Sequence, residues 1–238
     1  MAFRHRTAVA FCAAVLPALI ACALVDDDLK SDAAVPLTGL EISYREGQVD
    51  WHAARNGGIA FAYLRATEGG DDIDAMFARN WAKARGAGIA RGAYHYFYFC
   101  RSAEEQAEWF KKHVPLDNSA LPPVLYVEWN TRSRLCLRHP SRDEIRFDLE
   151  LFLYDVERFY DKKPIIYTTQ SFYRSYLADG FEQYPLWLRG GGLSDLPAMI
   201  RQDMVSAQVP GIGTAVNKHY FAGSKRAWYF LRTGQRVS

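Results

Sequence analysis

Glu128 is the side chain in this sequence that points most directly to acid–base chemistry. It follows an almost wholly apolar run that extends from Leu121 to Val127. A carboxyl group at the end of such a strand is partly removed from water, which favours its protonated form near neutral pH. A protonated carboxyl can give its proton to a leaving oxygen, as a general acid does. The alternative is a glutamate that only pairs with a nearby arginine at the rim.

Further acids, arginines and aromatic residues stand in or after the other short apolar runs. Besides Glu128 these are Glu41, Ser43, Tyr44, Arg65, Glu68, Tyr94, His95, Tyr96, Trp129, Trp187 and Arg189. If the runs are parallel strands of a barrel, polar side chains at their carboxyl ends meet where barrel enzymes have their active sites. A carboxyl group can protonate the leaving oxygen of a glycosidic bond or stabilise the charge that develops there, and aromatic faces stack on sugar rings. The combination therefore favours glycoside hydrolysis.

Other chemistries have less support in the sequence. No second His or Cys stands at ligand spacing from His95, so we expect a core histidine with satisfied hydrogen bonds and no metal site. Neither a G-x-S-x-G motif nor a P-loop is present, and we expect no cofactor. A formal net charge of +2 over 238 residues gives no electrostatic footprint for nucleic acid.

The elements that would position these residues alternate between strand and helix. We expect strands over 39–44, 59–65, 89–99, 124–129, 164–168 and 186–189, and helices over 50–56, 75–85, 102–113, 141–160 and 171–177. Ser102 with Glu105, and Ser141 with Glu144, form capping-box patterns at two helix starts. Alternation with short loops predicts an α/β fold with parallel strands. Successive strand–helix units followed by shorter strands predict a TIM-like (β/α)-barrel with irregular last strands.

The amino-terminal region differs from this pattern. Residues 1–21 combine basic residues at the start with an apolar run from Thr7, which is typical of a signal peptide and too short to span a bilayer stably. Leu19 to Cys22 is similar to the lipobox of bacterial lipoproteins, so Cys22 is a candidate for lipidation. Ordinary cleavage with secretion and an uncleaved anchor are the alternatives. Residues 22–37 are expected to form a polar tether.

Two cysteines and the carboxyl-terminal tail remain. Cys100 and Cys136 are an even pair in an exported chain and hence a disulfide candidate, with two free thiols as the alternative. The tail over 224–238 is basic and aromatic. It is expected to pack on the barrel, and contact with a membrane or an anionic glycan is the alternative.

Seven stretches with ordered spacing carry a family resemblance. They are Gly39–Ser43 with Val49–Trp51, Phe61–Gly69, Arg91–Phe97, Leu121–Glu128, Pro164–Thr168, Tyr184–Trp187 and Val209–Ile212. Leu121–Glu128, for example, reads L-P-P-V-L-Y-V-E beside a family pattern of L-P-P-V-L-D-[VIL]-E. Together the stretches resemble the family-25 glycoside hydrolases, the Chalaropsis-type lysozymes, over a barrel domain of residues 38–223.

The resemblance implies a substrate and roles for single residues. It implies cleavage of the β-1,4 bond between N-acetylmuramic acid and N-acetylglucosamine in the glycan strands of peptidoglycan. Glu128 matches the catalytic acid of the family, and Arg65, Tyr94 and Trp187 match positions that line its sugar groove. A bacterial subgroup in which two such cysteines pair supports a disulfide between Cys100 and Cys136.

Three acids of the family pattern are changed in this chain. The first-strand Asp is Glu41, the Asp two residues before Glu128 is Tyr126, and Asn217 replaces the Asp of V-D-x-N-x-F. Tyr126 is the most serious change, because the resemblance implies that this Asp orients and stabilises the substrate's N-acetyl group. A neutral tyrosine does not stabilise a developing cation as a carboxylate does, and one such contact contributes about 3 kcal/mol. Tyr126 and Asn217 keep the ability to hydrogen-bond substrate.

The sequence thus predicts a peptidoglycan muramidase of reduced activity, with Glu128 as acid and Glu41 as the supporting carboxylate. One alternative is a glycan-binding lipoprotein that keeps the groove and has lost turnover, and another is a hydrolase of a different N-acetylated glycan. We expect a monomer at the periplasmic face of the cell envelope. A lipid anchor would be its one contact with the membrane.

Overall fold

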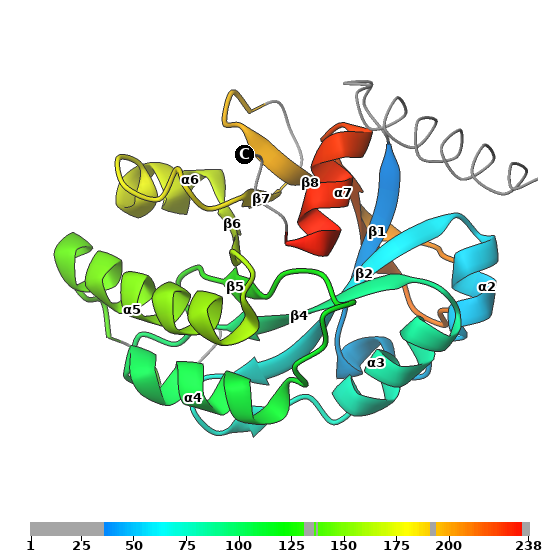
Figure 1. The fold of residues 1–238 in the computed structure, drawn as a ribbon, viewed down its shortest axis with the longest axis horizontal. Helices are drawn as coiled ribbons and strands as arrows, with labels where there is room; N and C mark the ends of the chain where they lie inside the picture. Colours follow the sequence, from blue (N-terminus) through cyan, green and yellow to red (C-terminus); the bar gives the residue numbers. More distant parts are fainter. Residues whose placement is uncertain (1–35, 131–135, 137, 191–193, 235–238) are drawn as a thin grey trace, which may run out of the picture.

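Eight strands close into a barrel in the computed structural model, which describes residues 36–130, 136, 138–190 and 194–234 (Figure 1). The strands are β1 (Leu37–Ile42), β2 (Ile59–Glu68), β4 (Ala90–Tyr96), β5 (Val124–Tyr126), β6 (Ile165–Thr169), β7 (Leu186–Arg189), β8 (Ala198–Ala207) and β9 (Val216–Phe221). Pairing of β1 with both β2 and β9 closes the ring. A two-residue strand, β3 (Asp72–Ile73), pairs with β2 outside the ring.

The strand directions confirm the predicted TIM-like barrel with irregular last strands. From β1 through β8 each neighbouring pair in the ring is parallel. The last strand, β9, is antiparallel to both β8 and β1. In the described ranges no helix separates β7 from β8 or β8 from β9, so the regular alternation of the first part is lost there.

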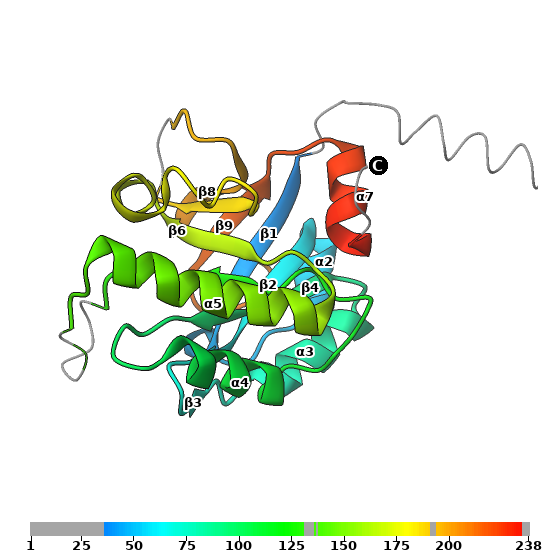
Figure 2. The same ribbon diagram turned by 60° about the vertical axis from the view of Figure 1, so that its left-hand side comes forward.

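Helices cover the outside of the barrel on the side of the first six strands (Figure 2). They are α2 (Trp51–Asn56), α3 (Phe77–Gly86), α4 (Ala103–His113), α5 (Arg142–Tyr160) and α6 (Gln170–Phe172), with short turns η1 (Tyr44–Glu46) and η2 (Tyr173–Leu177). Ser141 and Glu144 form the complete capping box that the sequence predicts at the start of α5. At α4, the Ser102 side chain accepts from the backbone N–H of Glu105.

Alternation along the strands separates two cores. Residues such as Leu40, Ile42 and Leu64 face the helices, whereas the barrel interior is filled mainly by aromatic residues. The interior set is Phe61, Tyr63, Tyr94, Leu121, Val124, Tyr126, Ile165, Tyr167, Trp187, Ile200, Phe221 and Leu231. The barrel is therefore packed solid in its lower part, and polar side chains are left for the end where the parallel strands finish.

His95 belongs to the outer core, as predicted for a satisfied histidine. Its ring stacks on Phe152 of α5 at 5.0 Å, and its two nitrogens lie 2.8 Å from Thr67 Oγ1 and 3.1 Å from Gln106 Oε1. Burial lowers the pKa of His95 to about 4, so the ring is neutral at ordinary pH. It has no access to the barrel end at which chemistry would take place.

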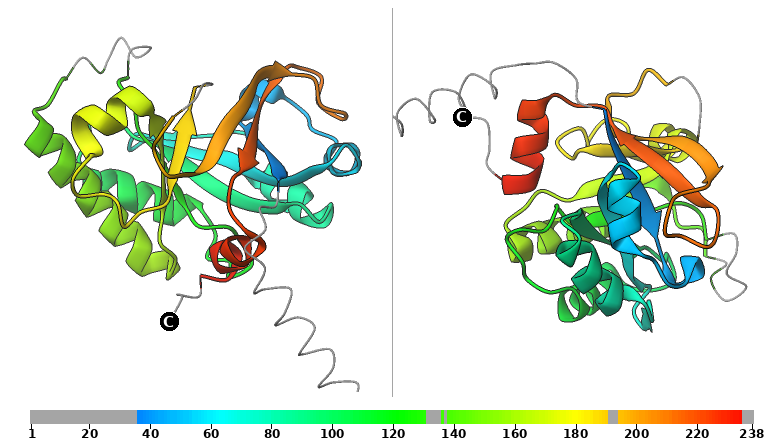
Figure 3. Two further views of the ribbon diagram at one scale, coloured as in Figure 1. Left: turned by 90° about the horizontal axis from the view of Figure 1, so that it is seen from above. Right: turned by 90° about the vertical axis from the view of Figure 1, so that its right-hand side faces the viewer.

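The tail forms a further helix, α7 (Lys225–Thr233), which closes the opposite end of the barrel (Figure 3). Trp228 packs against Phe61 at 5.6 Å and Phe221 at 5.1 Å, and Leu231 is buried in the barrel interior. Lys162 Nζ donates to the carbonyls of Arg232, Asn118 and Ala120 and so ties the end of α7 to neighbouring loops. The predicted packing of the tail on the barrel is confirmed for residues 224–234.

The predictions for the amino terminus concern residues that the structure does not describe. The signal peptide over 1–21, the lipidation candidate Cys22 and the tether up to residue 35 lie outside the described residues. Among the helices of the described ranges, none has the length and apolar character needed to cross a membrane.

Cys100 and Cys136 form a disulfide, as predicted. Their Cα atoms are 5.5 Å apart, and 36 positions of sequence separate them. The bond joins the segment after β4 to the segment before α5. Both segments follow strands whose ends line the candidate site described below.

We expect the double variant Cys100→Ser/Cys136→Ser to lose stability, because the bond restricts a long loop in the unfolded chain. Closure of a loop of this length corresponds to about 4 kcal/mol. Urea unfolding of the variant, beside wild type with and without reductant, measures the difference. A loss below about 1 kcal/mol would contradict this expectation.

Candidate active site

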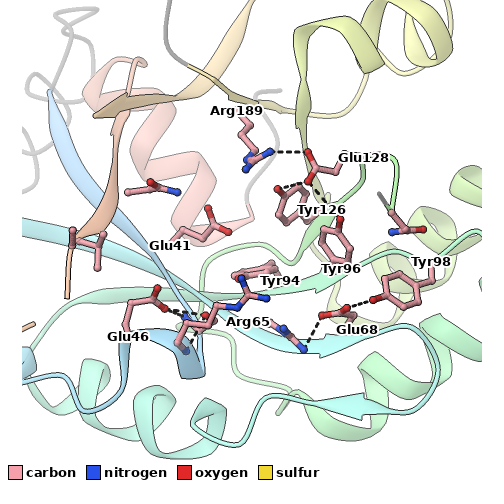
Figure 4. A pocket seen from close by; sticks show the side chains of 16 residues that line it. Glu41, Glu46, Arg65, Glu68, Tyr94, Tyr96, Tyr98, Tyr126, Glu128 and Arg189 are labelled. Carbon is pink, nitrogen blue, oxygen red and sulfur yellow. Dashed lines mark hydrogen bonds and ion pairs between the residues drawn. The ribbon is translucent and has the colours of Figure 1, made fainter. Parts of the chain in front are cut away.

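A polar cleft opens at the end of the barrel where the parallel strands finish (Figure 4). Its walls are Glu41, Ser43, Arg45, Glu46, Arg65, Glu68, Tyr94, Tyr96, Tyr98, Tyr126, Glu128, Asn130, Arg189, Ala215, Val216 and Asn217. The structure thus brings together six of the seven residues predicted for catalysis and substrate binding. The seventh, Trp187, does not line the cleft.

Glu128 lies in the cleft and is held by three donors. Arg189 Nη1 is 2.8 Å from its Oε2, and the hydroxyls of Tyr126 and Tyr96 donate to Oε1 at 3.0 and 3.5 Å. Ion pairing and hydrogen bonds to a carboxylate favour its charged form. The arginine pairing that the sequence left open as the alternative is therefore present.

Glu41 has the surroundings that were expected for Glu128. Strand β1 directs it into the barrel, where the Tyr167 hydroxyl donates to Oε2 at 2.9 Å and only 15% of the side chain is exposed. Burial raises the pKa of Glu41 from 4.5 to about 7, against the opposing effects of the Tyr167 hydrogen bond and the Arg189 charge. At neutral pH a large share of Glu41 is therefore protonated.

Tyr126 contributes to the different surroundings of the two glutamates (Figure 4). Burial, followed by the charges of Glu41 and Glu128, raises the pKa of Tyr126 far above its ordinary value. The Tyr126 hydroxyl therefore stays protonated and donates a hydrogen bond to Glu128. An Asp at this position would instead place a like charge beside Glu128 and push it towards protonation. In this chain Glu128 therefore has a neutral hydroxyl donor beside it where the family pattern has a second carboxyl group.

Arg65 and its acidic partners form another wall of the cleft. Its guanidinium lies 2.8 Å from Glu68 and 4.0 Å from Asp74, and it also pairs with Asp72 of β3. Glu68 in turn accepts a hydrogen bond from the Tyr98 hydroxyl. Three carboxylates therefore surround Arg65, and its position in the wall is fixed by the β2–β3 turn.

The prediction for Trp187 needs correction. Its side chain is fully buried in the barrel interior, where it stacks on Tyr167 at 4.1 Å and donates from Nε1 to His219 Nδ1 at 3.1 Å. A residue in this place cannot stack on a sugar. The strand phase was predicted correctly, since Arg189, two residues later on the same face, does reach the cleft.

Several cleft residues were not assigned a role from the sequence. Glu46 is one, and it accepts from Ser43 N at 2.6 Å and from Ser43 Oγ at 2.9 Å. Ser43-x-x-Glu46 is itself a capping box that starts η1, and this spacing was the signal that could have placed Glu46 at the barrel end. Within the described ranges, no cluster of His, Cys, Asp or Glu is arranged to hold a metal ion.

Comparison with known proteins agrees with this fold. The family model for glycosyl hydrolases family 25 matches residues 40–197. The uncharacterized protein YegX of Escherichia coli (strain K12) is 34% identical over 206 residues, which are 82% of this chain and 73% of YegX. Lysozyme M1 of Streptomyces globisporus is 30% identical over 203 residues, 78% of this chain and 68% of that protein.

A solved structure has the same architecture. The crystal structure of the bacterial lysozyme from Streptomyces coelicolor superposes with a TM-score of 0.76 at 28% identity, over 84% of this chain and 98% of that one. Together with the closed barrel, these matches show a glycoside hydrolase of the lysozyme type. The chain belongs to family 25 of the glycosyl hydrolases.

The raised pKa of Glu41 predicts how stability depends on pH. Between pH 4.5 and about 7 the folded protein keeps the proton that the unfolded chain releases, so this contribution is full at low pH and is lost as pH rises. The loss amounts to about 3 kcal/mol. Urea unfolding from pH 4 to 8 of wild type and Glu41→Gln, which cannot ionise, isolates it. Parallel pH curves for the two proteins would contradict the assignment.

Proposed function

We propose that this protein is a peptidoglycan muramidase that cleaves the β-1,4 bond between N-acetylmuramic acid and N-acetylglucosamine. The observation that carries the proposal is the presence, in one cleft, of two glutamates with opposite surroundings. Glu41 is buried and tends to hold a proton, whereas Glu128 is paired with Arg189. Two carboxyl groups whose surroundings separate their protonation states are what glycosidic cleavage requires. The lysozymes among the relatives support the choice of substrate.

The division of labour that we propose reverses the one expected from the sequence. Glu41 gives its proton to the glycosidic oxygen as the bond to the sugar breaks, and the Glu128 carboxylate stabilises the positive charge that develops on that sugar. A water molecule then forms a bond to the anomeric carbon of that sugar, and the proton that this water loses returns to Glu41. Arg189 and Tyr126 hold Glu128 in place during this step. Arg65, Tyr94 and Asn217 contact the sugar from the walls of the cleft.

The same contacts account for a slow enzyme. Each donor that stabilises the Glu128 carboxylate also reduces the charge it can offer to a cationic transition state. Tyr126 supplies a hydroxyl where the family pattern has a carboxylate, and one electrostatic contact of this kind contributes about 3 kcal/mol, or a hundredfold or more in rate. Binding without turnover is the second candidate function, and the Tyr126 and Asn217 substitutions are the observation that favours it.

Release of muropeptides from purified sacculi tests the proposal. We expect Glu128→Gln and Glu41→Gln each to lower the rate at least a hundredfold, because each removes one of the two carboxyl groups. Glu150→Gln, an exposed position on α5, is the matched control and should retain full activity. Mass spectrometry should find N-acetylmuramic acid at the new reducing ends.

A different result would favour the second candidate. If wild type releases nothing while wild type and both variants still sediment with sacculi, the protein is a glycan-binding module. Reducing ends on N-acetylglucosamine would identify another bond as the substrate.

The proposed acid predicts how the rate depends on pH. Since kcat/KM follows the free enzyme, it should fall tenfold per pH unit above about pH 7, where Glu41 loses its proton. Initial rates on soluble glycan fragments between pH 5 and 9 measure this limb. A rate that keeps rising to pH 9 would exclude Glu41 as the proton donor.

We also propose that the protein is exported and acts at the periplasmic face of the cell envelope as a monomer. The lipobox-like stretch that ends at Cys22 supports a lipid anchor. Mass spectrometry of the mature amino terminus distinguishes a diacylglyceryl-modified cysteine from ordinary cleavage near Ala21.

A further inference from the structure

A buried histidine stands behind Glu41 on the strand that closes the barrel. His219 of β9 is fully buried, and its Nε2 lies 3.7 Å from Glu41 Oε2. On the other side of the ring, Trp187 Nε1 is 3.1 Å from His219 Nδ1. The three side chains come from three strands, β7, β9 and β1, and form a line from the barrel interior to the cleft.

The indole determines which nitrogen of His219 carries the proton. An indole N–H is a donor only, so His219 Nδ1 must accept from Trp187 and cannot itself be protonated. Burial, followed by the charge of Arg189, lowers the pKa of His219 to about 3, so the ring is neutral. A neutral imidazole carries one proton, which therefore lies on Nε2, the nitrogen that faces Glu41.

This Nε2–H has no hydrogen-bond partner within the described structure. The nearby Glu41 Oε2 is 3.7 Å away, which is too long for a hydrogen bond. A buried donor without a partner lowers the stability of the fold, so its place beside a carboxyl group calls for an explanation. A small displacement of the Glu41 side chain would satisfy it.

We propose that His219, held by Trp187, is a positioning residue that receives the Glu41 carboxylate after its proton has left. When the O–H bond of Glu41 breaks and the proton moves to the leaving oxygen, Oε2 becomes an anion with the Tyr167 hydroxyl already bound at 2.9 Å. His219 Nε2–H then closes on the same oxygen as a second donor. Two preorganised donors stabilise the charge in a site where water is largely excluded.

This inference rests on the proposed function for its catalytic meaning but not for its test. The groups that face Glu41 from the surrounding elements are Tyr94, Tyr126, Tyr167, Arg189, His219 and Glu46. Trp187 and His219 can be changed without removing any other charge from this set. His219 also stands where the family pattern V-D-x-N-x-F has an asparagine, so the histidine is a departure of this chain from that pattern.

Two variants remove the donor in different ways. His219→Phe deletes the imidazole nitrogens. Trp187→Phe replaces the indole by a smaller aromatic ring without an N–H donor, so that the His219 proton is free to move to Nδ1. In both, Glu41 loses a donor to its charged form, and we expect its ionisation constant to fall about tenfold. Tyr63→Phe is the matched control, since it removes a buried hydroxyl without a hydrogen bond from the same interior layer.

NMR titration of ¹³C-labelled glutamate carboxyls in each folded variant gives the readout, with the Glu41 signal identified by its absence in Glu41→Gln. Imidazole ¹⁵N shifts should report Nε2–H in wild type and a changed tautomer in Trp187→Phe. An unchanged Glu41 titration in both folded variants, or an Nδ1–H tautomer in wild type, overturns the inference. If the protein also releases no muropeptides, the titration still decides this point, while the proposed hydrolysis fails separately.

Discussion

The cleft depends on a carboxyl group that the barrel holds in its aromatic interior. Glu41 follows the alternation of β1, and every second residue of that strand must point into a space filled by Tyr94, Tyr126 and Tyr167. Removal of a carboxylate from water is costly, and the group responds by keeping its proton. This constraint affects the rest of the site. A neutral acid can serve glycosidic cleavage only if a second, charged carboxyl group is stabilised elsewhere in the cleft.

Arg189 and the tyrosine hydroxyls provide that stabilisation at Glu128. The ion pair spans 61 residues of sequence, and it joins the strand ends of β5 and β7 on either side of β6. The side chain of Glu128 is 21% exposed and that of Arg189 is 33% exposed, so water still screens the pair and substrate can reach it. The structure therefore places a buried carboxyl group with a raised pKa and an arginine-paired carboxyl group in one cleft, without a metal ligand set among the described residues.

Much of this could be predicted from local pattern, and the exceptions have physical causes. Apolar runs of the first six ring positions predict parallel strands, and the strand-end acids do meet in one cleft. The long strands β8 and β9 were not predicted, because their polar and charged residues, such as Arg201 and Lys218, hide the alternation. The tail helix α7 was also missed, since its apolar face is defined only by the barrel end that it covers. Trp187 was wrongly assigned to the sugar groove. Alternation along a strand shows which face a side chain is on, but it does not show how deep in the barrel that side chain lies.

The protonation states of the two glutamates could not be derived from local sequence for a related reason. The apolar run before Glu128 correctly indicates low exposure of its side chain. Its partner Arg189 comes from a distant strand, so the local sequence does not show the ion pair. Substitutions at three positions act together here: Tyr126 removes a like charge beside Glu128, the longer Glu41 reaches into the interior, and His219 supplies a donor beneath it. Glu41 has one donor, the Tyr167 hydroxyl, at 2.9 Å and a second group, His219 Nε2, at 3.7 Å from the same oxygen. Donors to a carboxyl oxygen favour its ionised form. The same interior that makes Glu41 keep its proton by burial therefore also holds the groups that favour release of that proton.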